Sequence, residues 1–158
     1  MAKGQKWHTQ VHGDVGHAAP DVASWDHAKA LIASLDGRSR CDVFIGDVGG
    51  EVQGFLAVSG GNDGRHVIAV DDETRGRGNH WYLVRRTAND EPESVEVNHG
   101  GLPRDYPPTH VHGRATALAV AEHYFRTGRR DRRYRWQRGE PARPWETTDT
   151  AAARRRDA

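Results

Sequence analysis

The sequence predicts an α+β fold in which a single antiparallel sheet of about five to seven strands packs against two helices. Three observations predict it. Between residues 41 and 97, apolar residues recur at every second position in short runs that Gly, Asn and Asp separate. The segments 20–37 and 112–128 carry apolar residues at helical spacing. The stretch RYRWQRG at 133–139 alternates aromatic with polar residues, as a strand with one buried face does.

A first strand is expected around residues 7–11, and the first helix follows within 20–37. Ser24 is suited to cap this helix, because its hydroxyl can accept a hydrogen bond from a free backbone N–H of the first turn. Asp26 in that turn interacts favourably with the positive end of the helix dipole. Gly37 tolerates the left-handed backbone that ends many helices, so it is the predicted stop.

Five strands are expected next, in an antiparallel meander. Each run is short, rich in β-branched or aromatic residues, and bounded by turn residues. The runs are 41–47, 52–60, 65–72, 80–87 and 93–98. GGNDG at 60–64 tolerates the positive φ angles that hairpin loops require. The segments 71–79 and 87–93 are predicted to be two further hairpin loops.

The second half of the chain is predicted to cross the molecule and then form a helix and a strand. Residues 98–113 contain three prolines and three glycines, so we expect a crossing loop there and neither a helix nor a central strand. The helix within 112–128 ends at Gly128. Residues 1–138 are predicted to form one domain, and 139–158, which lack hydrophobic periodicity, a disordered tail.

The core is predicted to lie between the sheet and the two helices. A chain of this length buries roughly two-thirds of its unfolded surface, which requires one sizeable core. The predicted core consists of the apolar residues that the two periodicities place on inward faces. These are Phe44, Phe55, Leu56, Val58, Val67, Ile68, Leu83, Leu118, Phe125 and Trp136.

The composition favours a protein of the reducing cytoplasm. No segment approaches the ~20 apolar residues of a membrane span, and the N-terminus has no apolar signal region. The single cysteine, Cys41, excludes an intramolecular disulfide and a zinc site built from several thiolates. We therefore expect a cytoplasmic protein without a membrane partner.

The charges are unevenly distributed, although the formal net charge is only +1. Residues 1–128 hold thirteen Lys and Arg against seventeen Asp and Glu, whereas 129–138, the arginine segment, holds six arginines and one aspartate. These arginines complement the C-terminal end of the preceding helix, or they contact nucleic acid together with Tyr134 and Trp136. The first interpretation is favoured, since a nucleic-acid-binding protein usually spreads its basic residues over a whole face.

No catalytic residue, metal site or cofactor is predicted. His110 and His112 would share a face on extended chain, as two metal ligands could. The spacing specifies no third ligand, for which His99 and His123 are the candidates. Ser59 precedes a hairpin loop and not the strand-to-helix elbow that a nucleophilic serine needs. Loop and surface histidines are therefore the favoured interpretation.

Two blocks of residues carry a resemblance to a known family. They are GGNDGRHVIAV at 60–70 and VNHGGLPRDYPPTHVHGRATALAVAEHYFRTGRRDRRYRWQ at 97–137. With the order of elements, they resemble the immunity proteins of bacterial polymorphic toxin systems, in particular immunity family one (Imm-one). In that family a helix ends in an aromatic-x-x-Gly turn and the last strand carries a tryptophan, to which Phe125, Gly128 and Trp136 correspond.

The resemblance spans about residues 21–137. It implies an α+β protein without enzymatic activity that binds and neutralises a toxin domain encoded nearby, often a nucleic-acid deaminase. The alternatives are a small nucleic-acid-binding regulatory protein that uses the arginine segment, and a small hydrolase. A toxin gene adjacent to this one would favour the immunity function. Under that function the expected partner is a toxin domain and not nucleic acid.

The toxin contacts are predicted to be acidic. A toxin that acts on nucleic acid needs a basic substrate groove, because attraction to phosphates dominates such binding. An inhibitor that enters the groove gains association rate and specificity by presenting carboxylates. We therefore predict contacts at the two acidic loops and at an aromatic anchor, Trp81. The acidic residues are Asp71, Asp72, Glu73, Asp90, Glu91 and Glu93.

Overall fold

The computed structural model describes residues 8–12, 24–46, 54–72, 79–87, 90–100 and 102–139. Its main element is an antiparallel sheet of six strands in the order β1-β2-β3-β4-β5-β8. These strands are β1 (His8–His12), β2 (Asp42–Gly46), β3 (Gly54–Gly60), β4 (His66–Asp72), β5 (Asn79–Val84) and β8 (Arg135–Gly139). A second sheet pairs β6 (Val95–His99) with β7 (Leu102–Tyr106). The predicted α+β class is confirmed.

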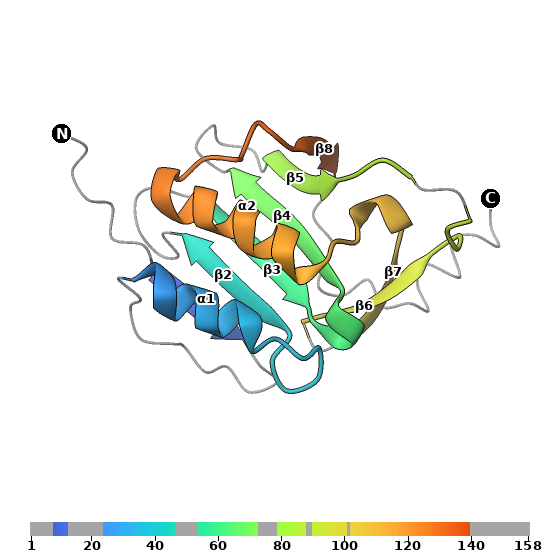
Figure 1. Cartoon of the computed structure of the whole chain (residues 1–158), viewed down its shortest axis with the longest axis horizontal. Coiled ribbons are helices and arrows are strands. Elements are labelled where there is room, and N and C mark those ends of the chain that lie inside the picture. Colours follow the sequence, from blue (N-terminus) through green and yellow to red (C-terminus); the bar gives the residue numbers. More distant parts are fainter. Residues whose placement is uncertain are drawn as a thin grey trace.

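Two helices, α1 (Trp25–Ala33) and α2 (Arg114–Thr127), lie side by side on one face of the main sheet (Figure 1). The predicted cap of α1 is present, since the Ser24 hydroxyl accepts a hydrogen bond from the His27 N–H at 3.2 Å. Neither helix in the described part of the chain has the length and apolar character needed to cross a membrane.

The two helices end differently. Gly128 ends α2 as predicted: its φ is 67°, and its N–H donates to the Tyr124 carbonyl at 2.7 Å. The first helix ends before the predicted Gly37. The Ser34 hydroxyl donates to the Leu31 carbonyl at 2.7 Å, and such side-chain bonds to the backbone compete with continued helix.

The strands β2 to β5 form the predicted meander. GGNDG joins β3 to β4 through a short 3-10 turn (Asn62–Gly64), in which even Asp63 has a positive φ of 54°. The prediction that 87–93 is a hairpin loop is wrong, because β5 pairs with β4 and β8, whereas β6 pairs with β7. The C-terminal strand β8 occupies the position beside β5 that the next strand of the meander would have taken.

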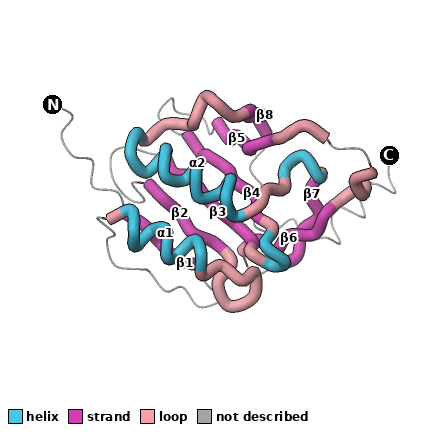
Figure 2. The backbone as a smooth tube through the Cα atoms, in the orientation of Figure 1, coloured by secondary structure: helices cyan, strands magenta, loops and turns pink. Residues whose placement is uncertain are grey.

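The hairpin of β6 and β7 corrects the expectation of a plain crossing loop at 98–113. Figure 2 shows the hairpin at one side of the main sheet. Pro103 lies in β7 opposite Asn98. A strand tolerates proline where its N–H is not needed in a ladder, and each strand of a two-stranded sheet has an unpaired edge. The hairpin packs its Val97 and Tyr106 on the face of the main sheet opposite the helices.

The larger core cluster lies between the main sheet and the helices. Leu56, Val58, Ile68 and Leu83 of the predicted core are fully buried in it, and Leu118, Phe125 and Trp136 pack against it partly buried. The other predicted residues lie on the opposite face of the sheet, which sequence periodicity alone did not separate. Val67 belongs to the cluster under the hairpin, and Phe44 and Phe55 pack edge to face at 5.5 Å. The predicted tail lies outside the described residues except for Gly139, which ends β8.

Candidate functional site

The first predicted acidic loop begins at the end of β4. Asp71 is only 13% exposed, and its Oδ2 lies 3.9 Å from Nδ1 of His80 on β5. Burial lowers the pKa of His80, and the nearby His99 lowers it further, which favours a neutral imidazole beside this carboxylate. Asp72 pairs with Asn79 in the ladder, and Glu73 lies outside the described residues. Asp71 therefore has little surface to offer a partner.

The second acidic loop follows β5. Asp90, with a φ of 67°, and Glu93 are exposed. Glu91 is held inward, because its Oε1 pairs with Nη2 of Arg85 at 2.5 Å and its side chain is 17% exposed. Within this loop, Asp90 and Glu93 are the carboxylates that a partner can reach.

The structure does not bring the two acidic loops together. One lies before β5 and the other after it, and a strand of this length spans about 20 Å. A partner that contacts both loops must therefore extend along β5 or β8. The assignment of these residues to toxin binding stays a prediction.

The aromatic anchor that we predicted, Trp81, is partly buried on β5. The Arg130 guanidinium lies 3.9 Å from the centre of its ring. This is the geometry of a cation–π contact, which stabilises a positive side chain over the face of an indole. The ring of Trp81 is thus already covered by the protein's own arginine.

Part of the arginine segment has a structural role. Asp131 is 1% exposed and accepts hydrogen bonds from Nε and Nη2 of Arg133. The bonds from the Arg133 side chain lower the pKa of Asp131. The Asp131 carbonyl also accepts the indole N–H of Trp136 at 3.0 Å. These bonds fasten the turn between α2 and β8.

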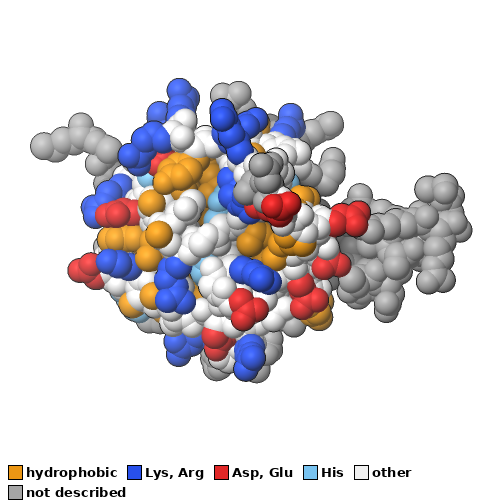
Figure 3. All heavy atoms as spheres, turned by 45° about the vertical axis from the view of Figure 1, so that its right-hand side comes forward, with side chains coloured by type: hydrophobic (Ala, Val, Ile, Leu, Met, Phe, Trp, Pro, Cys, Tyr) orange, Lys and Arg blue, Asp and Glu red, His pale blue; other side chains and the backbone are white. Residues whose placement is uncertain are grey.

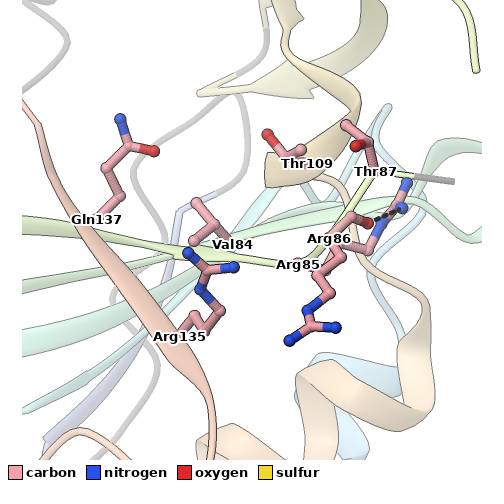
Figure 4. Close-up of a pocket in the computed structure, with 7 residues that line it drawn as sticks. All are labelled: Val84, Arg85, Arg86, Thr87, Thr109, Arg135 and Gln137. Carbon is pink, nitrogen blue, oxygen red and sulfur yellow. Dashed lines mark hydrogen bonds between the residues drawn. The ribbon is translucent and has the colours of Figure 1, made fainter.

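A polar hollow lies on the face of the β5–β8 pair that points away from the two helices. It is open to solvent and has a volume of about 490 Å³. Arg135 and Gln137 line it from β8 on one side, and residues that follow β5, together with Thr109, line it from the other (Figure 4). Its lining is Val84, Arg85, Arg86, Thr87, Thr109, Arg135 and Gln137.

Arg85 is a fixed part of this hollow. Its backbone N–H donates to the Thr109 carbonyl at 2.9 Å, and its Nε donates to the Val111 carbonyl at 3.0 Å. Its Nη1 bonds to the Arg86 carbonyl at 3.1 Å, the dashed contact in Figure 4, and Glu91 balances its charge. By contrast, Arg86 and Arg135 are exposed, and neither guanidinium has an ion pair among the described residues.

The histidines considered as metal ligands have other contacts. The Nε2 of His112 lies 2.8 Å from the Leu83 carbonyl, and Nδ1 of His110 lies 3.2 Å from the Thr109 hydroxyl. His99 bonds to the Tyr106 hydroxyl at 2.8 Å. In the part of the chain that the structure describes, no three His, Cys, Asp or Glu side chains are grouped as a metal site.

The surface charge is uneven. Figure 3 shows several Lys and Arg side chains along the top of the molecule, at the height of β5 and β8 in Figure 1, and others at the left and bottom among Asp and Glu side chains. Asp and Glu side chains gather lower on the right. The segment from Asp90 to Tyr106 contributes to this acidic side, since it has five carboxylates and one arginine. In this view the top is thus mainly basic, and the right side is richer in carboxylates.

A known protein family matches most of this chain. The model of the family described as Immunity protein Imm1 matches residues 16–138. The chain belongs to this family. A search of curated proteins gave no match.

The Imm1 match includes both helices, every strand from β2 to β7, most of β8 and the whole lining of the hollow. It also includes both acidic loops. The sequence reasoning missed the hollow, although a signal was present: Arg85, Arg86 and Thr87 stand together at the end of an apolar strand. Nothing in the linear sequence places them beside Arg135, because β5 and β8 meet only after the chain has formed the hairpin and α2.

Proposed function

We propose that this Imm1 protein neutralises a toxin domain encoded beside it by binding the toxin, without catalysing a reaction. It acts in the cytoplasm of the producing cell, and the toxin acts on nucleic acid as a deaminase. The observation that carries the proposal is the family match over residues 16–138. Exposed charged residues near β5 and β8 support it: the carboxylates of Asp90 and Glu93, and the arginines Arg86 and Arg135. Charged surfaces of this kind steer and orient a protein partner.

A stoichiometric titration tests this function. The toxin domain from the neighbouring gene is held at a fixed concentration, and its activity is measured as the Imm1 protein is added. A tight inhibitor lowers the activity linearly to zero at one equivalent, and the two proteins co-elute as a defined complex. Full toxin activity in a large excess of the Imm1 protein would refute the function. Time-dependent inactivation by a small fraction of an equivalent would indicate an enzyme.

The acidic loop after β5 gives a sharper prediction. We expect the double variant Asp90→Asn and Glu93→Gln to associate with the toxin about threefold to tenfold more slowly at low salt, because exposed carboxylates steer a basic partner. The association rates of variant and wild type should converge as salt screens the charges. Stopped-flow fluorescence measures both rates.

The matched control removes two negative charges elsewhere. Asp63→Asn with Glu122→Gln takes them from the β3–β4 turn and from the exposed side of α2. We expect association of this variant to be close to that of the wild type. Equal slowing of both double variants would mean that only net charge matters, and the assignment of the loop would be wrong. Asp71 is unsuitable for such a test, because its side chain is mostly buried.

A further inference from the structure

We propose that the arginine-lined hollow beside β8 binds an acidic, extended segment of the partner protein, which adds to the sheet as a strand along β8. This inference rests on the proposed function, since it names a chemical feature of the toxin. The acidic loops that we predicted would contact basic surface of the toxin. The hollow would accept carboxylates from a different part of it.

The charge of the hollow is the first argument. Glu91 compensates Arg85, but no carboxylate among the described residues compensates Arg86 or Arg135. The planar guanidinium group donates two parallel hydrogen bonds, which match the two oxygens of a carboxylate. An acidic side chain that enters the hollow therefore meets Arg86, which follows β5, and Arg135 of β8, neither of which has a carboxylate partner among the described residues.

The remaining lining suits the same ligand. Thr87, Thr109 and Gln137 present hydroxyl and amide groups, which can donate further hydrogen bonds to oxygen atoms. The wall that Arg85 forms is fixed before any ligand binds, because this side chain bonds to two carbonyls and to Glu91. A preformed wall reduces the entropy lost on binding.

The position of β8 is the second, independent argument. In the described part of the chain no strand lies outside β8 in the main sheet. An edge strand presents backbone N–H and C=O groups to a partner strand. Arg135 lies opposite Val84 and Gln137 opposite Tyr82, so Arg135 and Gln137 point to the face that holds the hollow. Every second side chain of an added strand would stand on that same face.

The aromatic residues nearby favour a protein over nucleic acid as the occupant. Single-stranded nucleic acid binds where bases stack on exposed rings. Arg130 covers the Trp81 ring, and Tyr134 and Trp136 are partly buried against the core. Arg133 is bound to Asp131. As far as the described residues show, this surface therefore offers guanidinium groups without a carboxylate partner and a strand edge, but no exposed aromatic platform on which bases could stack.

Hexaglutamate is the probe for the hollow itself, with neutral hexaglutamine as its control. In the ¹⁵N-labelled full chain, we expect hexaglutamate to shift the amide signals of Thr87, Thr109 and Gln137. The variant Arg86→Gln with Arg135→Gln should weaken this binding about tenfold or more. The matched variant Arg129→Gln with Arg132→Gln removes two exposed charges from the turn after α2 and should change it less than about twofold.

Three results with these probes would overturn the inference. They are the absence of hexaglutamate shifts at the hollow, equal weakening by both double variants, and tighter binding of a single-stranded decathymidylate that depends on Arg86 and Arg135. The last result would identify nucleic acid as the ligand.

The toxin from the neighbouring gene separates the inference from the proposed function. We expect the Arg86→Gln, Arg135→Gln variant to dissociate from the toxin at least about tenfold faster than the wild type, with an unchanged melting temperature. Unchanged dissociation would refute the role of the hollow and leave the inhibitor function intact. A wild-type protein that does not bind the toxin would refute the proposed function itself, whatever hexaglutamate does.

Discussion

Replacing Trp136 with alanine is expected to lower the free energy of unfolding by about 3 kcal/mol, the lower end of the range for large aromatic deletions. The indole packs against the core cluster between the sheet and the helices, where it lies opposite Leu83. Its N–H also donates to the Asp131 carbonyl at 3.0 Å. The substitution removes both the buried ring and the bond that joins β8 to the turn before it. Urea denaturation measures the change.

Two further variants separate these contributions. Trp136→Phe keeps an aromatic ring but loses the indole N–H, so about 1 kcal/mol of the loss is expected from the missing hydrogen bond. Leu102→Ala is the control, because Leu102 is 47% exposed and its loss should cost less than about 0.5 kcal/mol. If Trp136→Ala costs no more than Leu102→Ala, the indole has no place in the core, and the packing described for β8 is wrong.

The sequence was most informative where local signals are strong. Period-two runs located β2 to β5, and helical spacing located α1 and α2, because each pattern reflects one buried face of one element. Capping was also readable: Ser24 and Gly128 act as predicted, since their roles depend on a few neighbouring backbone groups. Elements of this kind are determined mainly within a single segment of the chain.

Pairing between distant segments could not be read in the same way. The strand β7 was hidden by its own Pro103 and by the prolines and glycines on either side of it, which exclude a central strand but not the edge position that β7 has. The hollow depends on β8 pairing with β5 and not with β6. The separation of Asp71 from Asp90 likewise follows from which end of β5 each loop occupies. Such features depend on contacts between segments that are far apart in the chain, which local sequence patterns do not specify.

The structure also predicts marked sensitivity to mild acid, because several histidines are buried. His66 is fully buried, and burial is the main cause that lowers its pKa, with Arg114 lowering it further. Burial likewise lowers the pKa of His99, although Asp42 acts in the opposite direction. Burial also lowers the pKa of His112, although the hydrogen bond to the Leu83 carbonyl acts in the opposite direction. In each case the folded protein favours the neutral ring, whereas the unfolded chain binds a proton at the ordinary pKa of about 6.5.

The sign of the effect follows from proton linkage. A histidine with a lowered pKa in the folded state contributes its full stability above pH of about 6.5, and this stability is lost as the pH falls from there through the folded pKa. Each such group makes the free energy of unfolding decrease by up to about 1.4 kcal/mol per pH unit. Asp131, whose pKa is also lowered, adds to the loss only below pH of about 4. The interval between pH of about 7.5 and about 5 therefore isolates the histidines.

We expect the free energy of unfolding, measured with urea at several pH values, to fall steadily across that interval. His66→Leu should make this decrease shallower, because it removes one group that binds a proton mainly in the unfolded chain. His27→Gln is the matched control: it removes a histidine that lies exposed on α1, and the slope should stay that of the wild type. A free energy of unfolding that is level over the interval, or a slope that His66→Leu leaves unchanged, would show that burial of these rings is not what couples folding to protons.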